Sequence, residues 1–355
     1  MSGNPETGEE ARPERVLIEL ARDGDQGAFG ELVGPYRAEL HAHGYRMLGS
    51  VHDAEDALQD ALLRAWRGLP GFEGRSSVRS WLHTILSNAA LDFGRRRARR
   101  EVPAGFSPAG QLAEPAWLEP YPDAAVGDLR AASPEARYEL RESLELAFVI
   151  ALQHLPPAQR AVLILRDVVG LSAAEMASQL GTTVPAVTSA LQRARASVAG
   201  RLPGHTQQAT LRSLGDAQTR ALAGRYADAI ERGDADLLVS MLTRDATWTM
   251  PPESACIRGT AAITEFIRHE VGSVRWQHRA TRANGQLAIG CYIWAERLGG
   301  YAASVLDVLT LDGGQIAGVH AFIIAEHVEQ PGYDGRFTAA DFTRFGLPTV
   351  LPETG

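Results

Sequence analysis

Apolar residues at helical spacing dominate the N-terminal part of the chain. From Glu14 to about Arg100 they recur at intervals of three and four positions, as in the runs ALLRAW and VRSWLHTILSNAALDF. This spacing gives a helix one apolar face, which must pack against another element. We therefore predict one all-α unit over residues 14–100.

The helical periodicity stops after this unit and returns further along the chain. Residues 101–137 are rich in Pro, Ala and Gly, which indicates a linker, with Trp117 to Asp123 as a candidate docking segment. Helical spacing then resumes and continues to Ala199. A second all-α unit is predicted for residues 138–202.

The last third of the chain has a different residue pattern, in which helical runs are followed by alternating apolar and polar positions. Alternation of period two is typical of half-buried strands. The strand-like runs are ATWTMPP, LAIGCYIWAERL, YAASVLDVLTL and QIAGVHAFIIAEHV. Asp312, Gly313 and Gly314 separate the last two runs and predict a tight hairpin turn. These patterns predict an α+β domain over residues 208–330 and a tail over residues 331–355.

The composition fits several globular domains, because 45% of the 355 residues are apolar. The net charge of -8 argues against a chain that coats nucleic acid along its whole length. Charge is instead segregated: residues 1–73 contain seven Arg and fourteen Asp or Glu, whereas residues 79–100 contain six Arg and one acid, Asp92. The first unit therefore has an acidic end and a basic end.

Nothing in the sequence points to a membrane, a cofactor or a metal site. The N-terminal residues lack the basic and then apolar segments of a secretory signal, and no later run is apolar enough to cross a bilayer. A cytoplasmic protein is expected. Cys256 and Cys291 lie in strand-like apolar surroundings, so both are predicted to be buried free thiols rather than a disulfide or metal ligands.

The basic end carries a candidate site for nucleic acid. Its arginines follow a helix with aromatic and polar groups, a combination suited to stacking on unpaired bases while guanidinium groups hold phosphates. The residues are Trp81, His83, Asn88, Asp92, Arg95, Arg96 and Arg97. The alternative is a solvated helix end or a basic localisation patch, since runs of charge are nonspecific.

A second candidate nucleic-acid site has helix-turn-helix spacing. One helix runs from Ser172 to Gly181, and a second begins at Thr182 or Thr183. The exposed side of the second helix would present polar groups to a major groove, namely Thr188, Ser189, Gln192, Arg193 and Arg195. Its inward positions are predicted to be Val184, Val187, Leu191 and Val198. A plain helical hairpin is the alternative.

In the order and the residue patterns of their motifs, residues 14–200 resemble an extracytoplasmic-function sigma factor. This is the compact class that keeps regions 2 and 4 of the larger RNA polymerase sigma factors. The stretch DAEDALQDALLRAW resembles region 2.2, whose helix docks on the clamp helices of the polymerase. The resemblance implies that Asp56, Gln59 and Asp60 bind core RNA polymerase. Without the resemblance, these residues could equally form an ordinary solvent-exposed face of a helix. Trp66 is expected in the core in either case.

Residues 80–97 resemble the segment of region 2 that opens the duplex at the -10 element and captures a flipped base. That task needs aromatic surface, amide hydrogen bonds and a phosphate clamp. The resemblance implies these roles for Trp81, Asn88, Asp92 and Arg96.

The run LPPAQR followed by LILRDVVGLSAAEMA resembles the start of region 4, whose helix-turn-helix reads the -35 element. Relatives often carry Arg or Asn where this chain has Thr188. The base preference at that position is therefore not carried over, and Gln192 and Arg193 are the better candidates for base contacts.

The C-terminal third resembles a SnoaL-like domain, in which helices and a curved sheet form a cone with an apolar cavity. The resemblance rests on RYADAIERGDADLLVSMLTRDATWTMPP and IRGTAAITEFI. Strand alternation places Trp248 and Met250 on one face, and likewise His320, Phe322 and Ile324, so both sets are expected to line the cavity. Simple core packing is the alternative for each residue.

Some members of this fold are cyclases or isomerases, which need an acid or base in the cavity. Asp307 and His320 are the candidates here. Fold similarity alone assigns no reaction, and a cone fused to a sigma factor resembles the subclass whose extra domain modulates polymerase or promoter binding. We therefore expect a regulatory domain without a catalytic residue. The expected partners are core RNA polymerase, promoter DNA and, as a candidate, a small-molecule ligand of the cone.

Two other classes of function stay open on the sequence alone. One is a small-molecule sensor, or a cyclase- or isomerase-type enzyme, fused to a DNA-binding module. The other is a conventional transcription factor that binds duplex DNA without polymerase.

The arginine run gives a testable prediction. Replacing Arg95, Arg96 and Arg97 by Ala should weaken promoter binding and flatten its salt dependence, by roughly 0.9 in the log-log slope for each phosphate that the variant no longer neutralises. Titrations with promoter DNA between about 50 and 200 mM salt measure this slope. An unchanged slope would remove the role assigned to the run.

Overall fold

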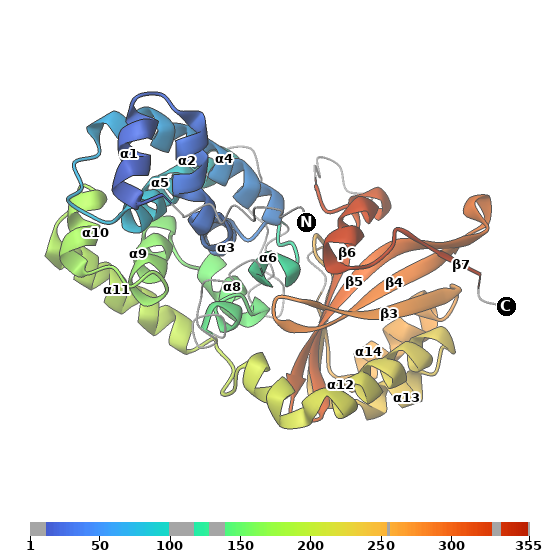
Figure 1. The fold of residues 1–355 in the computed structure, drawn as a ribbon. Helices are drawn as coiled ribbons and strands as arrows, with labels where there is room; N and C mark the ends of the chain where they lie inside the picture. Colours follow the sequence, from blue (N-terminus) through green and yellow to red (C-terminus); the bar gives the residue numbers. More distant parts are fainter. Residues whose placement is uncertain (1–11, 99–116, 128–138, 254–255, 329–334, 354–355) are drawn as a thin grey trace, which may run out of the picture.

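The computed structural model describes residues 12–98, 117–127, 139–253, 256–328 and 335–353. Helices make up the N-terminal half of the chain, and a sheet with its own helices makes up the C-terminal half beside it (Figure 1). The predicted order of two all-α units followed by an α+β domain is confirmed.

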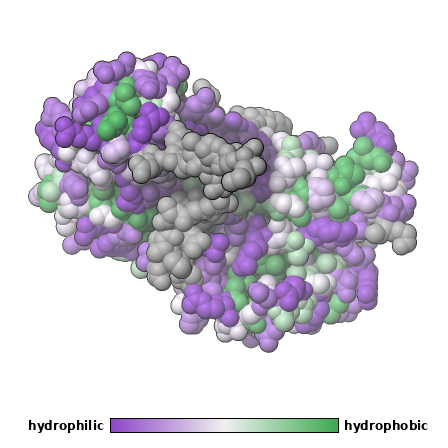
Figure 2. Space-filling model, viewed as in Figure 1, coloured by the Kyte–Doolittle hydropathy of each residue, from purple (hydrophilic) through white to green (hydrophobic). Residues whose placement is uncertain are grey.

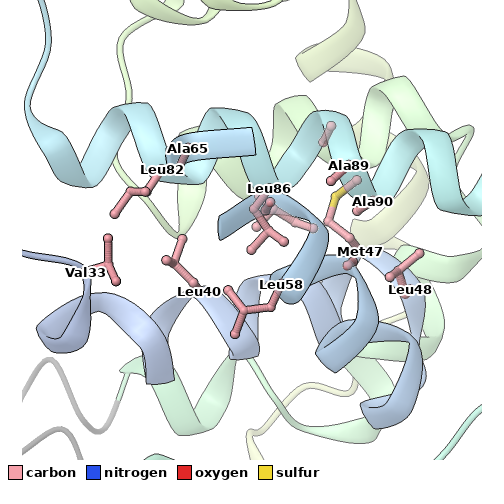
Figure 3. Packing of buried hydrophobic residues seen from close by; sticks show 14 of the residues in the cluster. Val33, Leu40, Met47, Leu48, Leu58, Ala65, Leu82, Leu86, Ala89 and Ala90 are labelled. Atoms are coloured by element: carbon pink, nitrogen blue, oxygen red, sulfur yellow. The ribbon is translucent and has the colours of Figure 1, made fainter. Parts of the chain in front are cut away.

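Five helices within the described residues form the first unit. They are α1 (Glu14–Arg22), α2 (Gln26–Val33), α3 (Arg37–Leu48), α4 (Val51–Gly68) and α5 (Val78–Ala98), with 3-10 turns at Gly34–Tyr36 and Leu69–Gly71. Polar side chains cap two of them, since Asp25 accepts a hydrogen bond from the Ala28 N–H and Ser50 accepts one from the Asp53 N–H. Apolar side chains of α3, α4 and α5 point toward one another in a shared core (Figure 3).

The second unit contains the predicted helix-turn-helix. Its helices are α8 (Leu146–Gln153), α9 (Pro157–Asp167), α10 (Ala173–Gln179) and α11 (Val184–Ala199), and a short helix in the linker is α6 (Ala124–Gly127). Ser172 and Glu175 form a capping box at the start of α10. Gly181 ends that helix with a φ of 62°, which glycine adopts without strain, and Thr183 caps α11. The predicted turn between the two helices is therefore confirmed.

The C-terminal domain packs three helices against a seven-stranded sheet. The helices are α12 (Gln207–Glu231), α13 (Ala235–Ser240) and α14 (Thr260–Phe266), and the strands are β1 (Leu242–Thr249), β2 (Cys256–Arg258), β3 (Trp276–Ala283), β4 (Gln286–Ala295), β5 (Gly300–Asp312), β6 (Gln315–Ile323) and β7 (Val350–Pro352). The strand order is β2-β1-β6-β5-β4-β3, with β7 paired to β5. Among the described strands, only β1 and β6 pair in parallel. Asp312 lies opposite Gln315, which confirms the predicted hairpin at Gly313 and Gly314.

The two faces of this sheet pack against different parts of the molecule. Helices α12, α13 and α14 cover one face, in a core that includes Trp248 and Ile289. The other face packs against α3, α4 and α8, in a core that includes Tyr45, Val149 and Phe322. The helical units and the sheet therefore share one hydrophobic core, which fixes their relative position.

Three strands were not expected from the sequence. Strands β2 and β7 are only three residues long, and β3 carries Arg279 and Arg282 at the edge of the sheet, which weakens its apolar alternation. Beyond the expected end of the domain at residue 330, the described part of the chain forms the 3-10 helix η6 (Ala339–Phe345) and β7 against the sheet. Most of the linker expected at 101–137 lies outside the described residues.

Two predicted burials are wrong. Cys256 is exposed because it lies on the short edge strand β2, whereas Cys291 is buried as predicted. Val184 is 44% exposed, since it is the first residue of α11 and precedes the packed positions Val187 and Val198.

The face of the molecule seen in Figure 2 is mostly hydrophilic and has separate apolar patches. Among the described residues, no helix combines the length and the apolar character needed to cross a bilayer.

Arg160 fixes the second helical unit to the first. This buried side chain donates a hydrogen bond to the carbonyl oxygen of Met47 in α3, and others to the side-chain oxygen of Gln153 at 2.6 Å and to the Gln153 and Leu155 carbonyl oxygens at 2.9 and 3.2 Å. Buried carbonyl groups that lose such a donor have no water to replace it. The contact between the units therefore depends on the guanidinium group.

We expect Arg160→Met to lower the free energy of unfolding by roughly 2–4 kcal/mol, because several buried carbonyl groups lose a charged donor. Urea unfolding followed by tryptophan fluorescence measures the change. The exposed Arg201 in the same unit offers a matched control, and Arg201→Met should change stability by less than about 0.5 kcal/mol. Equal effects of the two substitutions would contradict the anchoring role.

Candidate functional site

The acidic face of α4 is paired with the C-terminal segment, which we define as residues 335–353. Arg336 lies 2.6 Å from Asp56 and 3.8 Å from Asp53, and Arg344 lies 2.5 Å from Glu55. Asp56, one of the predicted polymerase-binding residues, is therefore held by an ion pair within the molecule.

The other two predicted polymerase-binding residues lie beside it on α4. Asp60 pairs with Arg64 one helical turn away, at 2.7 Å. Gln59 lines a groove of about 950 Å³ between α2, α3 and α4, which we call the α4 groove. Its apolar walls include Phe29, Val33, Leu58, Leu62, Leu63 and Trp66. Leu63 is 51% exposed at this groove.

The predicted aromatic group of α5 is packed rather than presented. Trp81 is half-buried, and its ring lies 4.8 Å from that of Phe72 between centroids. Asn88, in contrast, is exposed. Of these two candidates for base contacts, only Asn88 is available to another molecule in this conformation.

The basic end of α5 is solvent-facing but partly neutralised. Asp92 forms ion pairs with Arg64 at 2.9 Å and with Arg95 at 3.2 Å. Arg96 is exposed, with its guanidinium 5.7 Å from the ring centre of Phe93. The side chain of Arg97 lies outside the described residues.

The opposite side of α5 is covered by the second helical unit. Thr84 donates a hydrogen bond to the side chain of Gln179 in α10, and Arg79 donates one to the carbonyl oxygen of Val169 at 3.0 Å. Arg79 also binds Glu39 of α3 at 2.9 Å. Burial would raise the pKa of Glu39, but hydrogen bonds from His83 and Arg79 lower it to about 2. His83, predicted on the exposed side, is buried here and faces this carboxylate.

The polar face of α11 is exposed along its length, as predicted for a recognition helix. Thr188 and Gln192 are exposed, Ser189 accepts a hydrogen bond from Arg193 at 2.5 Å, and Arg195 forms an ion pair with Asp167 of α9. The predicted DNA-contacting side chains of α11 therefore lie together on one surface.

The predicted docking segment in the linker binds the start of α4. The Glu119 carboxylate accepts hydrogen bonds from the Ser50 hydroxyl at 2.9 Å, the Val51 N–H at 2.8 Å and the His52 side chain at 3.0 Å. A carboxylate at a helix N-terminus satisfies free N–H groups and complements the helix dipole. The docking prediction for residues 117–123 is confirmed, although the role of Glu119 had no signal in the sequence.

Asn284 joins the sheet to both helical units at the tip of the β3–β4 hairpin. Its side-chain oxygen accepts from the Tyr121 N–H at 2.8 Å, and its side-chain nitrogen donates to the Tyr45 hydroxyl at 2.9 Å and the Leu144 carbonyl at 2.8 Å. The residue is fully buried and has a φ of 54°, a left-handed conformation that Asn tolerates better than most residues. No sequence motif marked this position.

The five cavity candidates of the cone do not share one cavity. Trp248 and Met250 lie in the core beneath α12–α14, whereas Phe322 lies in the core shared with the helical units, as does Ile324. Strand pairing explains the difference. Trp248 is opposite Val319 on the neighbouring strand β6, and Phe322 lies an odd number of positions from Val319 and so faces the other side of the sheet. Asp307 is opposite Ala321, whereas His320 is opposite Val308, the next residue. The expectation that both sets line the cavity is therefore wrong.

The two candidate acid–base residues are separated in the same way. Asp307 accepts hydrogen bonds from the Tyr226 hydroxyl at 2.8 Å and from Cys291 Sγ at 3.2 Å, and burial raises its pKa. His320, on the other face, lies 3.2 Å from the hydroxyls of both Thr249 and Thr310. These side chains cannot act on one substrate atom.

Comparisons with known proteins agree with this division of the chain. Sigma-70 region 2 matches residues 32–100, Sigma-70 region 4 matches residues 146–198, and the SnoaL-like domain matches residues 223–319. The helix-turn-helix and the α4 and α5 surfaces thus lie in the two sigma regions.

Two sigma factors of known sequence are similar to most of the chain. The ECF RNA polymerase sigma factor SigG of Mycobacterium tuberculosis is 39% identical over 93% of this chain and 86% of its own length. The ECF RNA polymerase sigma factor SigJ of the same species is 31% identical over 65% of this chain and 69% of its own length.

The crystal structure of Mycobacterium tuberculosis SigJ shares the fold, with a TM-score of 0.54 at 24% sequence identity over 82% of this chain and 94% of that one. The chain therefore belongs to the extracytoplasmic-function (ECF) family of sigma factors, the subunits that bind core RNA polymerase and promoter DNA and direct transcription initiation.

Proposed function

We propose that this sigma factor is held in a closed state by its SnoaL-like domain and C-terminal segment, and that promoter recognition requires the closed state to open. In the open state, Asp56, Gln59, Asp60 and the α4 groove bind core RNA polymerase. The observation that carries the proposal is the pair of ion pairs from Arg336 and Arg344 to the acids of α4.

The assignment of DNA contacts follows the exposed surfaces of the two sigma regions. In α5, Asn88 and Arg95 to Arg97 contact the -10 element, with Trp81 and Asp92 released from their intramolecular contacts as the duplex opens. In α11, the -35 element is read by Thr188, Ser189, Gln192, Arg193 and Arg195. Exposed amide and guanidinium groups on one helix face suit base edges and phosphates in a major groove.

Promoter geometry also requires the two sigma regions to separate. The -35 and -10 elements lie roughly 25 base pairs apart, about 85 Å of duplex at 3.4 Å per base pair. In the closed state α9 and α11 share a core with α3 and α5, so the two regions are in direct contact. Residues 99–137 connect them, and an extended chain of this length reaches well beyond that distance at ~3.3 Å per residue.

The SnoaL-like domain acts in this proposal as a regulatory domain and not as an enzyme. Asp307 and His320 face opposite sides of the sheet, and the His320 side is occupied by the packing against the helical units. An acid–base pair for a cyclase or isomerase is therefore not assembled from these residues. A protein that binds core polymerase and promoter DNA acts in the bacterial cytoplasm.

We expect the double substitution Arg336→Glu, Arg344→Glu in the full chain to favour the open state. Half-exposed ion pairs contribute roughly 0.2–1 kcal/mol each, so their reversal should raise the affinity for core RNA polymerase by about 3- to 10-fold. Run-off transcription from a cognate promoter should rise in parallel. Both are measured with purified core polymerase.

A matched control for the charge change is Arg268→Glu, Arg297→Glu. Arg268 pairs with Asp236 inside the SnoaL-like domain, and Arg297 is exposed on the same domain. This control should leave polymerase affinity unchanged. Unchanged or weaker polymerase binding by the Arg336, Arg344 variant would contradict the closed-state proposal.

The closed state should also weaken at high pH through His52. This side chain bridges Glu119 of the linker at 3.0 Å and Asp341 of the C-terminal segment at 3.2 Å. Burial alone would lower the pKa of His52, but the hydrogen bonds to Asp341 and Glu119 raise it from 6.5 to about 9. The stabilisation is therefore complete below pH 6.5 and is lost as the pH rises through 9.

The measurement is the melting temperature of the full chain between pH 6.5 and 9.5. We expect it to fall by roughly 2–4 °C more in the parent protein than in His52→Gln, which has no titrating group at this position. Other titrating groups are common to both proteins and cancel in the difference. Parallel pH profiles for the two proteins would show that the bridge does not depend on the His52 charge.

A further inference from the structure

A second cavity lies between the linker, the SnoaL-like domain and the C-terminal segment. Its volume is about 560 Å³, which lies within the range of small-molecule sites. Four segments line it, with Asp123 and Ala124 from the linker, Asp216, Thr219, Arg220 and Ala223 from α12, Ala280, Thr281, Arg282 and Leu287 from β3 and β4, and Arg344, Phe345 and Gly346 from the C-terminal segment. We call it the junction cavity.

The junction cavity has an excess of incompletely paired positive charge. Arg220 makes no ion pair with any residue in the described part of the chain, although Asp216 lies one helical turn before it. Arg282 reaches only to 3.9 Å from one oxygen of Asp123. The other oxygen of Asp123 already accepts a hydrogen bond from the Gly285 N–H at 2.7 Å. Two guanidinium groups are therefore available to an anion.

Part of the remaining wall is apolar. Ala223 and Leu287 belong to the core beneath α12–α14, and Phe345 belongs to the core shared with the helical units. Guanidinium groups bind carboxylates and phosphates through paired hydrogen bonds, while apolar walls favour a ligand with a hydrophobic body. The lining therefore suits a small organic acid better than an inorganic ion.

One ion pair connects this cavity to the α4 groove. Arg344 lines the junction cavity, whereas its partner Glu55 lines the α4 groove. The linker helix α6 lies between the two, since Ala124 borders the junction cavity and Ala125 borders the groove. An anion in the junction cavity would compete with Glu55 for Arg344.

We propose that the junction cavity binds a small organic acid, with a carboxylate or phosphate group between Arg220 and Arg282 and an apolar body against Leu287 and Phe345. Binding draws Arg344 away from Glu55 and thereby favours release of α4. The binding site stands on the geometry of the cavity alone, whereas this effect on α4 rests on the closed-state function proposed above.

Isothermal titration calorimetry of the full chain with phenyl phosphate, benzoate and inorganic phosphate tests the site. We expect phenyl phosphate to bind with a dissociation constant on the order of 1 mM, because a ligand of this size gains at most a few kcal/mol. Inorganic phosphate should bind more weakly, since it lacks the apolar body. The substitutions Arg220→Gln, Arg282→Gln should raise the dissociation constant of phenyl phosphate at least about 10-fold, because they remove charge-assisted hydrogen bonds.

The control Arg268→Gln, Arg297→Gln removes the same charge elsewhere on the domain and should leave binding unchanged. Equal binding by the parent and by the Arg220, Arg282 variant would overturn the site, as would no binding of the organic probes. Inorganic phosphate binding as tightly as phenyl phosphate would also overturn it, because that result indicates general attraction of anions.

A second measurement separates the site from the closed-state function. Phenyl phosphate should raise the affinity of the parent chain for core RNA polymerase, and should have no such effect on Arg344→Gln. A second outcome is that phenyl phosphate binding disappears in the Arg220, Arg282 variant while phenyl phosphate leaves the polymerase affinity of the parent chain unchanged. That result would support the binding site and overturn its coupling to α4. Failure of the Arg336, Arg344 charge reversal would overturn the closed state itself, and leaves the calorimetric result for the site intact.

Discussion

The docking of the sigma regions on the sheet depends on one buried amide, the side chain of Asn284. Its three hydrogen bonds reach the linker at Tyr121, helix α3 at Tyr45 and the segment before α8 at Leu144. A buried amide is stable only when its donors and acceptor are satisfied. The hairpin tip therefore fits the helical units in one register, and the surrounding apolar side chains complete a single core across the junction.

This docking gives the acids of α4 two competing roles. Within the molecule, Glu55 and Asp56 neutralise two arginines of the C-terminal segment. In the function that we propose, the same helix face binds core RNA polymerase. Because half-exposed ion pairs contribute little free energy, such contacts are strong enough to bias an equilibrium and weak enough to exchange. A domain that covers this face can regulate the factor without a separate inhibitor.

The SnoaL-like domain provides two different surfaces through one sheet. Its helices bury one face together with Asp307, and the other face, with Phe322, serves as a docking platform for the sigma regions. Using a sheet face for docking removes that face from ligand binding. The junction cavity borders both cores, at the sheet edge formed by β3, where the linker and the C-terminal segment meet. Regulation by a ligand would therefore act at the interface between domains.

The sequence alone determined the two helical units, the helix-turn-helix, the long strands and the family. These features depend on local rules, namely apolar periodicity, caps such as Ser172 and the Gly313-Gly314 turn, and on motifs with fixed order. The tertiary structure alone decided which residues meet across the chain. The contacts of Glu119, Asn284 and Arg344 join segments far apart in sequence, and one sequence carries no periodic signal for them. Strand pairing likewise placed Asp307 and His320 on opposite faces, because a shift of one residue along a strand reverses the side of the sheet.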